Sequence, residues 1–254
     1  MVEITKLSLL ASAIAARSQG PTNVAHCPLT PAALQLPSGQ TTLVAPTFAP
    51  DFVAIGVGVQ NYTCSSSSNF TSSGAVAELF DISCYVDTPI FSSLSPATFA
   101  FWSALPSLGT FNTTSLISLF NNPLYLGGNP NPVVDGQHYF VPNPVTGAGI
   151  SPAFDFSSGR FNGFAGNDGE EGKKATVVAG GTVNLKSPDD PTVDVDWLRL
   201  SALQFPGQGE LAQTVFRVET AGGQPPSSCN NTGSTISVKY VAKYYFYNST
   251  LPSN

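Results

Sequence analysis

The sequence predicts an all-β protein: a single-domain β-sandwich or barrel of many short antiparallel strands, with a few short helices and long loops. Two observations support this prediction. Segments rich in Val, Ile, Phe and Tyr recur between Gly- and Pro-rich turns, and no helical segments alternate with them. The chain has 254 residues, of which 42% are hydrophobic, so it is long enough to bury one substantial core.

The N-terminal residues 1–16 have the pattern of a signal peptide. An apolar run at 7–16 follows Lys6, ends in small residues and is too short to span a bilayer. Residues 17–52 are rich in proline, which predicts an extended arm that lies over the surface of a β domain at 53–248.

The β domain is predicted to begin with an antiparallel hairpin. A Ser-rich loop separates two segments rich in apolar residues, 53–63 and 74–82. Residues 96–120 contain bunched apolar residues without alternation, and this pattern predicts short helices. Further strands are predicted at 137–141, 153–156, 160–164, 175–185, 193–205 and 212–220.

The last predicted strand has the clearest pattern in the chain. From Ile236 to Tyr247, every second residue is apolar or aromatic, and these residues form one face of the predicted strand. The opposite face carries Ser237, Lys239, Val241, Lys243, Tyr245 and Tyr247. A period of two predicts a half-buried strand. Tyr245 and Tyr247 would then lie on the exposed face.

Composition narrows the classes of partner. Charged residues make up 10% of the chain, and the net charge is -6. The longest basic run is Lys173-Lys174, so no nucleic-acid partner is expected. No apolar run after the leader is long enough for a membrane helix, so no membrane partner is expected once the leader is cleaved.

Four cysteines follow the leader, and an even number in a secreted chain predicts two disulfides. Closely spaced cysteine pairs are absent, so no metal site is expected. At about 3.3 Å per residue, the predicted hairpin separates Cys64 from Cys84 by more than ~20 Å. The arm enters the hairpin near the end that holds Cys84. We therefore expect Cys27 to pair with Cys84, and Cys64 with Cys229.

Five Asn-x-Ser/Thr triplets predict a secreted glycoprotein. The acceptor residues are Asn61, Asn69, Asn112, Asn230 and Asn248.

Several blocks of the chain resemble a known family. They include Trp197-Leu198-Arg199-Leu200, residues 217–229 from Arg217-Val218-Glu219 to Cys229, and Tyr244-Tyr245-Phe246-Tyr247. Over about residues 50–247, these blocks are similar to a family of secreted fungal and bacterial proteins classed as a domain of unknown function. The resemblance implies fold and location, and it supplies no catalytic residues.

Fungal members of that family are often labelled malate dehydrogenase, but the chain lacks the motif that this activity needs. A dinucleotide site requires Gly-x-Gly-x-x-Gly between a strand and a helix. Residues 56–61 lack the third glycine and lie within a predicted strand. Neither NAD nor any other cofactor is therefore expected.

His138, Trp197, Arg217 and Glu219 are the candidate ligand-binding residues. Arg217 and Glu219 are two apart in a predicted strand, so they should point the same way and form a polar pocket with His138 or Trp197. The alternative is an ion pair between Arg217 and Glu219 that fixes the turn at 222–226.

Catalytic motifs are weak, and the catalytic residues stay unknown. A Gly-x-Ser-x-Gly elbow is absent, and only His26 and His138 could act as a base. Asp194 and Asp196 should share a strand face and could bind a sugar or a cation, or could simply form an exposed acidic face. Cleavage after Ala25 would let His26 and His138 hold copper, as in copper-dependent polysaccharide oxygenases.

Two hypotheses follow. The first is a non-enzymatic secreted protein of the cell wall or host interface that binds polysaccharide or another glycan through exposed Trp197, Tyr245 and Tyr247. The second is a carbohydrate-active enzyme, either a glycosidase with dispersed carboxylates or a copper polysaccharide oxygenase.

Overall fold

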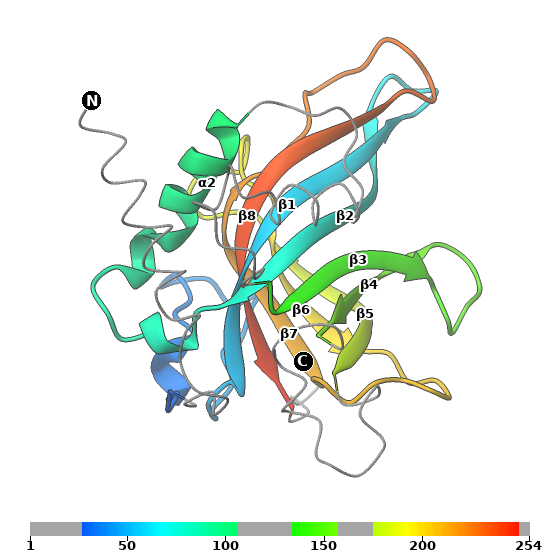
Figure 1. The fold of residues 1–254 in the computed structure, drawn as a ribbon. Coiled ribbons are helices and arrows are strands. Elements are labelled where there is room, and N and C mark those ends of the chain that lie inside the picture. The colour runs from blue at the N-terminus through cyan, green and yellow to red at the C-terminus, as the bar shows by residue number, and fades with distance from the viewer. Residues whose placement is uncertain (1–26, 106–133, 157–174, 249–254) are drawn as a thin grey trace, which may run out of the picture.

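The computed structural model describes residues 27–105, 134–156 and 175–248, and in these it confirms the all-β prediction. Eight antiparallel strands form a closed barrel in chain order (Figure 1). The strand expected at 160–164 and the helical region expected beyond residue 105 lie outside the described residues. The strands are β1 (Phe52–Cys64), β2 (Phe70–Asp81), β3 (Gly136–Pro142), β4 (Ile150–Asp155), β5 (Thr176–Leu185), β6 (Trp197–Ala202), β7 (Thr214–Gly222) and β8 (Thr235–Tyr247).

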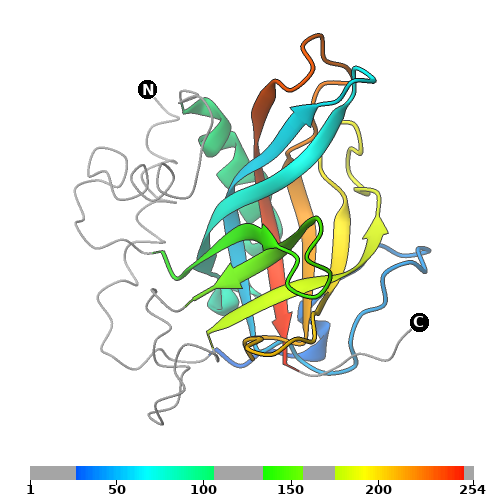
Figure 2. The same cartoon turned by 90° about the vertical axis from the view of Figure 1, so that its right-hand side faces the viewer.

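Pairing of β1 with both β2 and β8 closes the barrel. The predicted hairpin is therefore present as β1 and β2. Figure 2 shows β3 and β4, in green, running across the direction of β1 and β8, as the strand tilt of a closed barrel requires. Each strand pairs with two neighbours, although β2 and β3 pair only from Ala77 opposite His138 to Leu79 opposite Gly136. In regular stretches, alternate residues of a strand point into the barrel.

The inner cluster of buried side chains fills one end of the barrel. The rings of Phe52 and Phe246 stack with centroids 4.3 Å apart, and Phe156 meets both rings edge-on. Phe52 begins β1 and Phe246 lies near the end of β8, so this aromatic plug closes the end of the barrel where β1 enters. The opposite end, where β1 ends, has no such plug among the described residues.

One helix covers the outer face of the barrel. Helix α2 (Leu94–Ala104) lies against β8, β7 and β1 (Figure 1). Trp102 Nε1 donates a hydrogen bond of 2.7 Å to Gly58 O. A Cβ atom at Gly58 would lie 2.0 Å from Val76 O, so only glycine permits this close pairing of β1 and β2. The glycines in this segment therefore serve strand packing.

The arm also covers the outer face, together with three short 3-10 helices, η1 (Pro31–Ala33), η2 (Ser83–Tyr85) and η3 (Phe91–Ser93). Between the barrel and these segments lies a cluster of buried side chains, here called the outer cluster, which includes Tyr245 and Tyr247. Leu29 and Phe48 of the arm pack against it, and the ring centroids of Phe48 and Tyr247 are 5.7 Å apart. Tyr245 and Tyr247 are 0% exposed. The prediction that they lie on an exposed face is wrong, because the arm and α2 bury the outer face of β8.

The two disulfides have the predicted pairing. Cys27 and Cys84 have Cα atoms 5.0 Å apart, and Cys64 and Cys229 have Cα atoms 5.8 Å apart. The bridges lie at opposite ends of the β1–β2 hairpin and attach to it the arm and the loop before β8. Within the described ranges, no helix has the length and apolarity needed to cross a membrane.

Candidate functional site

A cavity of about 380 Å³ opens inside the barrel at the end without the aromatic plug, and all eight strands contribute to its walls. This volume lies within the range of small-molecule sites. One side is apolar and contains Phe140, Ile150 and Pro152 of the β3–β4 hairpin. The other sides carry polar groups, among them His138 and Arg217 from the predicted set.

His138 lies on the inner face of β3, and its ring stacks on Phe154 with centroids 4.4 Å apart. Its Nδ1 atom is 2.9 Å from Ala153 O. Because a carbonyl oxygen only accepts, Nδ1 carries the proton, and Nε2 keeps its lone pair in the neutral ring. Burial lowers the pKa of His138 to about 4. At neutral pH, His138 is therefore a hydrogen-bond acceptor in the cavity wall.

Arg217 extends into the cavity from β7. Its Nε and Nη2 atoms donate to Asp196 O at 3.3 and 2.9 Å, which fixes the plane of the guanidinium group. The ion pairs within the described part of the chain are Lys186–Asp196 and Lys243–Glu219, so no carboxylate of that part neutralises Arg217. Arg217 is thus a positioned, half-buried cation without a carboxylate partner in the described residues.

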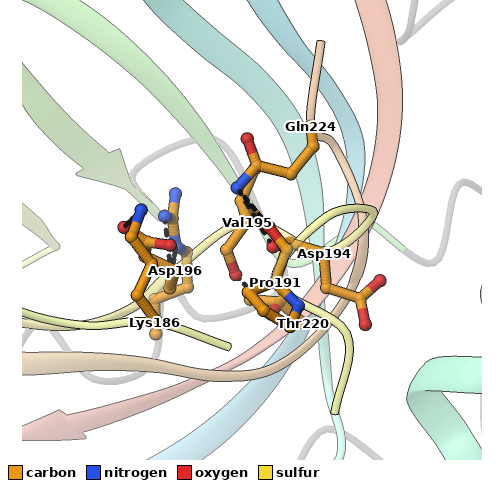
Figure 3. A network of polar contacts seen from close by, with 8 residues as sticks. Lys186, Pro191, Asp194, Val195, Asp196, Thr220 and Gln224 are labelled. Carbon is orange, nitrogen blue, oxygen red and sulfur yellow. Dashed lines mark hydrogen bonds and ion pairs between the residues drawn. The ribbon is translucent and has the colours of Figure 1, made fainter. Parts of the chain in front are cut away.

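The carboxylates of Asp194 and Asp196 point away from each other, as Figure 3 shows, and they have different partners. The Asp196 carboxylate borders the cavity and accepts from Lys186 Nζ at 3.1 Å. Asp194 Oδ1 instead accepts from the backbone of Gly222 at 2.6 Å. The two residues were expected to share one strand face, as a sugar or cation site or as an exposed acidic face. Instead, Asp194 Oδ1 accepts from the backbone, and only Asp196 lines the cavity.

Two side chains hold the segment that carries Asp196 in place. Thr220 Oγ1 donates to Val195 O at 2.6 Å, and Gln224 Nε2 donates to Asp194 O at 3.2 Å (Figure 3). These bonds link the segment before β6 to the end of β7 and the turn after it. Asp196 O, which orients Arg217, therefore lies in a segment that hydrogen bonds tie to β7 and the turn after it.

The structure separates Glu219 from Arg217. Glu219 has a φ of 46°, and the register between β7 and β8 shifts between Val218 and Ala221. This bulge breaks the alternation of the strand and places Glu219 beside Lys243, with which it forms an ion pair. The expectations that Arg217 and Glu219 point the same way, or pair with each other, are both wrong.

Trp197 is also outside the cavity wall and packs in the outer cluster. Of the four predicted residues, His138 and Arg217 thus share the cavity, whereas Trp197 and Glu219 do not.

Sequence reasoning missed Gln60, Tyr62 and Tyr244, which line the cavity beside Arg217 and His138. Gln60 is 6% exposed, and its Nε2 atom makes no hydrogen bond of normal geometry among the described residues. A signal was present, because Gln60 is the first polar residue after the apolar run from Phe52 to Val59 and lies at an inward position of the strand. Burial raises the pKa of Tyr62 to about 12, so its hydroxyl stays protonated and donates to Gly223 O at 2.8 Å.

The described lining of the cavity can be compared with the groups that hydrolases use. Glycosidases use two carboxyl groups that flank the scissile bond. Within the described residues, the cavity is lined by one carboxylate, Asp196, which pairs with Lys186. A pKa near 4 makes His138 a weak base at neutral pH. His26, the other histidine of the copper hypothesis, lies outside the described residues.

Comparison with known proteins identifies the family. A family model described as "Protein of unknown function (DUF3455)" matches residues 45–248, a range that includes all eight strands. Searches of curated proteins and of solved structures find no match. The match covers most of the sequence, and the chain belongs to this DUF3455 family of proteins of unknown function.

Proposed function

We propose that this protein is a secreted glycoprotein that binds a small glycan-derived ligand inside its barrel and does not turn it over. Three features support secretion: the leader pattern at 1–16, the Asn-x-Ser/Thr triplets and the two disulfides. Its place of action is the cell wall or the host interface.

The open cavity in the barrel is the observation that carries this proposal. It combines apolar walls with a few convergent polar groups, which is the composition of small-molecule sites. The surface aromatics first considered for glycan contact are buried, since Trp197 is 5% exposed and both tyrosines are 0% exposed. We therefore propose that the glycan-derived ligand binds in the cavity. Its lining includes the aromatic ring of Phe140 and the polar side chains of Asn184 and Gln224.

The proposed binding site can be tested by blocking the cavity without disturbing the core. Ser72 is exposed and lines the cavity, so Ser72→Tyr should fill the opening and abolish binding. Ser73 is also exposed but does not line the cavity, so Ser73→Tyr is the matched control. Calorimetry with a panel of neutral and acidic mono- and disaccharides measures binding. We expect saturable binding to the wild type and to Ser73→Tyr, and no binding to Ser72→Tyr.

The same samples distinguish binding from catalysis. Chromatography of the saccharides after long incubation should recover them unchanged. Release of products by the wild type, and its loss in Ser72→Tyr, would instead favour the carbohydrate-active enzyme. Equal binding to the wild type and to Ser72→Tyr would rule out the cavity as the site.

A further inference from the structure

We infer that the ligand is a small sugar acid, whose carboxylate binds to the guanidinium group of Arg217 and whose hydroxyl groups bind to the polar atoms around it. This inference rests on the proposed role of the cavity as a ligand site. It adds the chemical class of the ligand.

The state of Arg217 is the first argument. Arginine is well suited to partly desolvated ion pairs, because its planar guanidinium group binds carboxylates through two parallel hydrogen bonds. Arg217 has no such partner among the described residues, although Asp196 O holds its Nε and Nη2 atoms. Asp196 O takes two of its five N–H groups and the Tyr244 hydroxyl group also bonds to Arg217, so N–H groups remain for a ligand. A carboxylate from outside the chain would complete the pairing.

The charge of the cavity selects a monoanion. Arg217 and Lys186 bring two positive charges to the wall and Asp196 brings one negative charge, so the described lining has a net charge of +1. A carboxylate balances this charge, whereas a phosphate dianion would exceed it and approach the Asp196 carboxylate. Lys186 contributes less than Arg217 because its side chain is 74% exposed and pairs with Asp196.

The remaining polar atoms call for hydroxyl groups on the ligand. His138 Nε2 is an acceptor, as the bond from Nδ1 to Ala153 O shows. Asp196 Oδ1 and Gln60 Nε2 are buried polar atoms of two further lining residues, and neither makes a hydrogen bond of normal geometry within the described part of the chain. A sugar hydroxyl both donates and accepts, so one hydroxylated ring can satisfy such a mixture. The apolar wall at Phe140 suits the C–H face of a sugar ring.

Matched acids and esters test this inference. Galacturonate and glucuronate have the same rings as their methyl esters but differ in charge. One charge-assisted hydrogen-bonded pair should make each acid bind the wild type about 10-fold to 100-fold more tightly than its ester. Arg217→Gln should remove this preference. Lys239→Gln, which deletes an equal charge on the outer face of β8, away from the cavity lining, should retain it.

The outcomes separate the two proposals. Equal affinity of acid and ester for the wild type would overturn the carboxylate inference and leave the cavity as a ligand site. That comparison needs no variant, so it decides the question even where Arg217→Gln does not fold. Binding of 4-hydroxybenzoate in place of both uronates would overturn the sugar assignment. Failure of every acid, ester and neutral saccharide to bind would overturn both proposals.

Discussion

Glu78 is a buried carboxyl group on the outer face of β2, and it allows a quantitative test of the packing. Its side chain is 0% exposed, and neither carboxyl oxygen makes a hydrogen bond of normal geometry among the described residues. Burial raises the pKa of Glu78 from 4.5 to about 8, and Gln137 on β3 offsets part of this effect. At neutral pH, Glu78 is therefore protonated in the folded protein and ionised in the unfolded chain.

The sign and size of the pH effect follow from this difference. Between pH 4.5 and about 8 the folded state keeps a proton that the unfolded state has lost, so the free energy of unfolding falls as pH rises. Each pH unit changes this free energy by about 1.4 kcal/mol, so the loss between pH 4.5 and 7 is about 3 kcal/mol. Gln keeps the shape of the neutral acid and cannot ionise, so Glu78→Gln removes this loss.

Urea unfolding followed by circular dichroism, with the disulfides intact, measures the effect. The stability of Glu78→Gln relative to the wild type should increase by about 3 kcal/mol from pH 4.5 to 7, while Glu210→Gln at an exposed position should show no such trend. Comparing the change with pH cancels any constant difference between Gln and protonated Glu. A difference for Glu78→Gln that does not vary with pH would refute the burial of this carboxyl group.

Three further predictions concern other parts of the chain. Lys243→Ala leaves the partly buried Glu219 without its ion-pair partner, so it should lower the free energy of unfolding by about 3–5 kcal/mol in urea titrations. The double variant Lys243→Met, Glu219→Gln removes both charges and should recover most of this loss. Glycopeptide mapping should find glycans at the exposed loop residues Asn69 and Asn230 but not at Asn61. The Asn61 side chain accepts a hydrogen bond from Ser237 Oγ at 2.7 Å within the barrel wall, so a glycan there would contradict the β1–β8 pairing. Calorimetry should show no NAD binding, since the Gly56–Gly58 segment is paired inside β1, and saturable micromolar binding would disprove this.

Local patterns predicted the strands but not what covers them. The alternation from Ile236 to Tyr247 correctly indicated a strand, since it depends only on neighbours in the sequence. Its outer face is buried by Phe48, Trp102 and their neighbours, which are distant in the sequence. Period-two patterns carry no information on such long-range covering, so Tyr245 and Tyr247 were wrongly placed at the surface.

The candidate site could be predicted only in part for a similar reason. His138 and Arg217 were selected by residue type and strand position, and the barrel brings them to one cavity. The predicted position of Glu219 is wrong because the strand has a bulge between Val218 and Ala221. Glu219 has a positive φ there although it is not glycine, so the sequence carries no signal that the inward–outward alternation of the strand fails at this point. Closure of eight strands also decides which inward residues meet, which explains why Gln60 and Tyr244 were missed.

A crystal structure of the wild-type protein soaked with galacturonate tests the central claim most directly. We predict a bound sugar acid inside the barrel, with its carboxylate within hydrogen-bond distance of the Arg217 guanidinium group and a hydroxyl group facing His138 Nε2. An empty cavity at a saturating concentration, or a sugar acid bound only on the outer surface, would contradict the account.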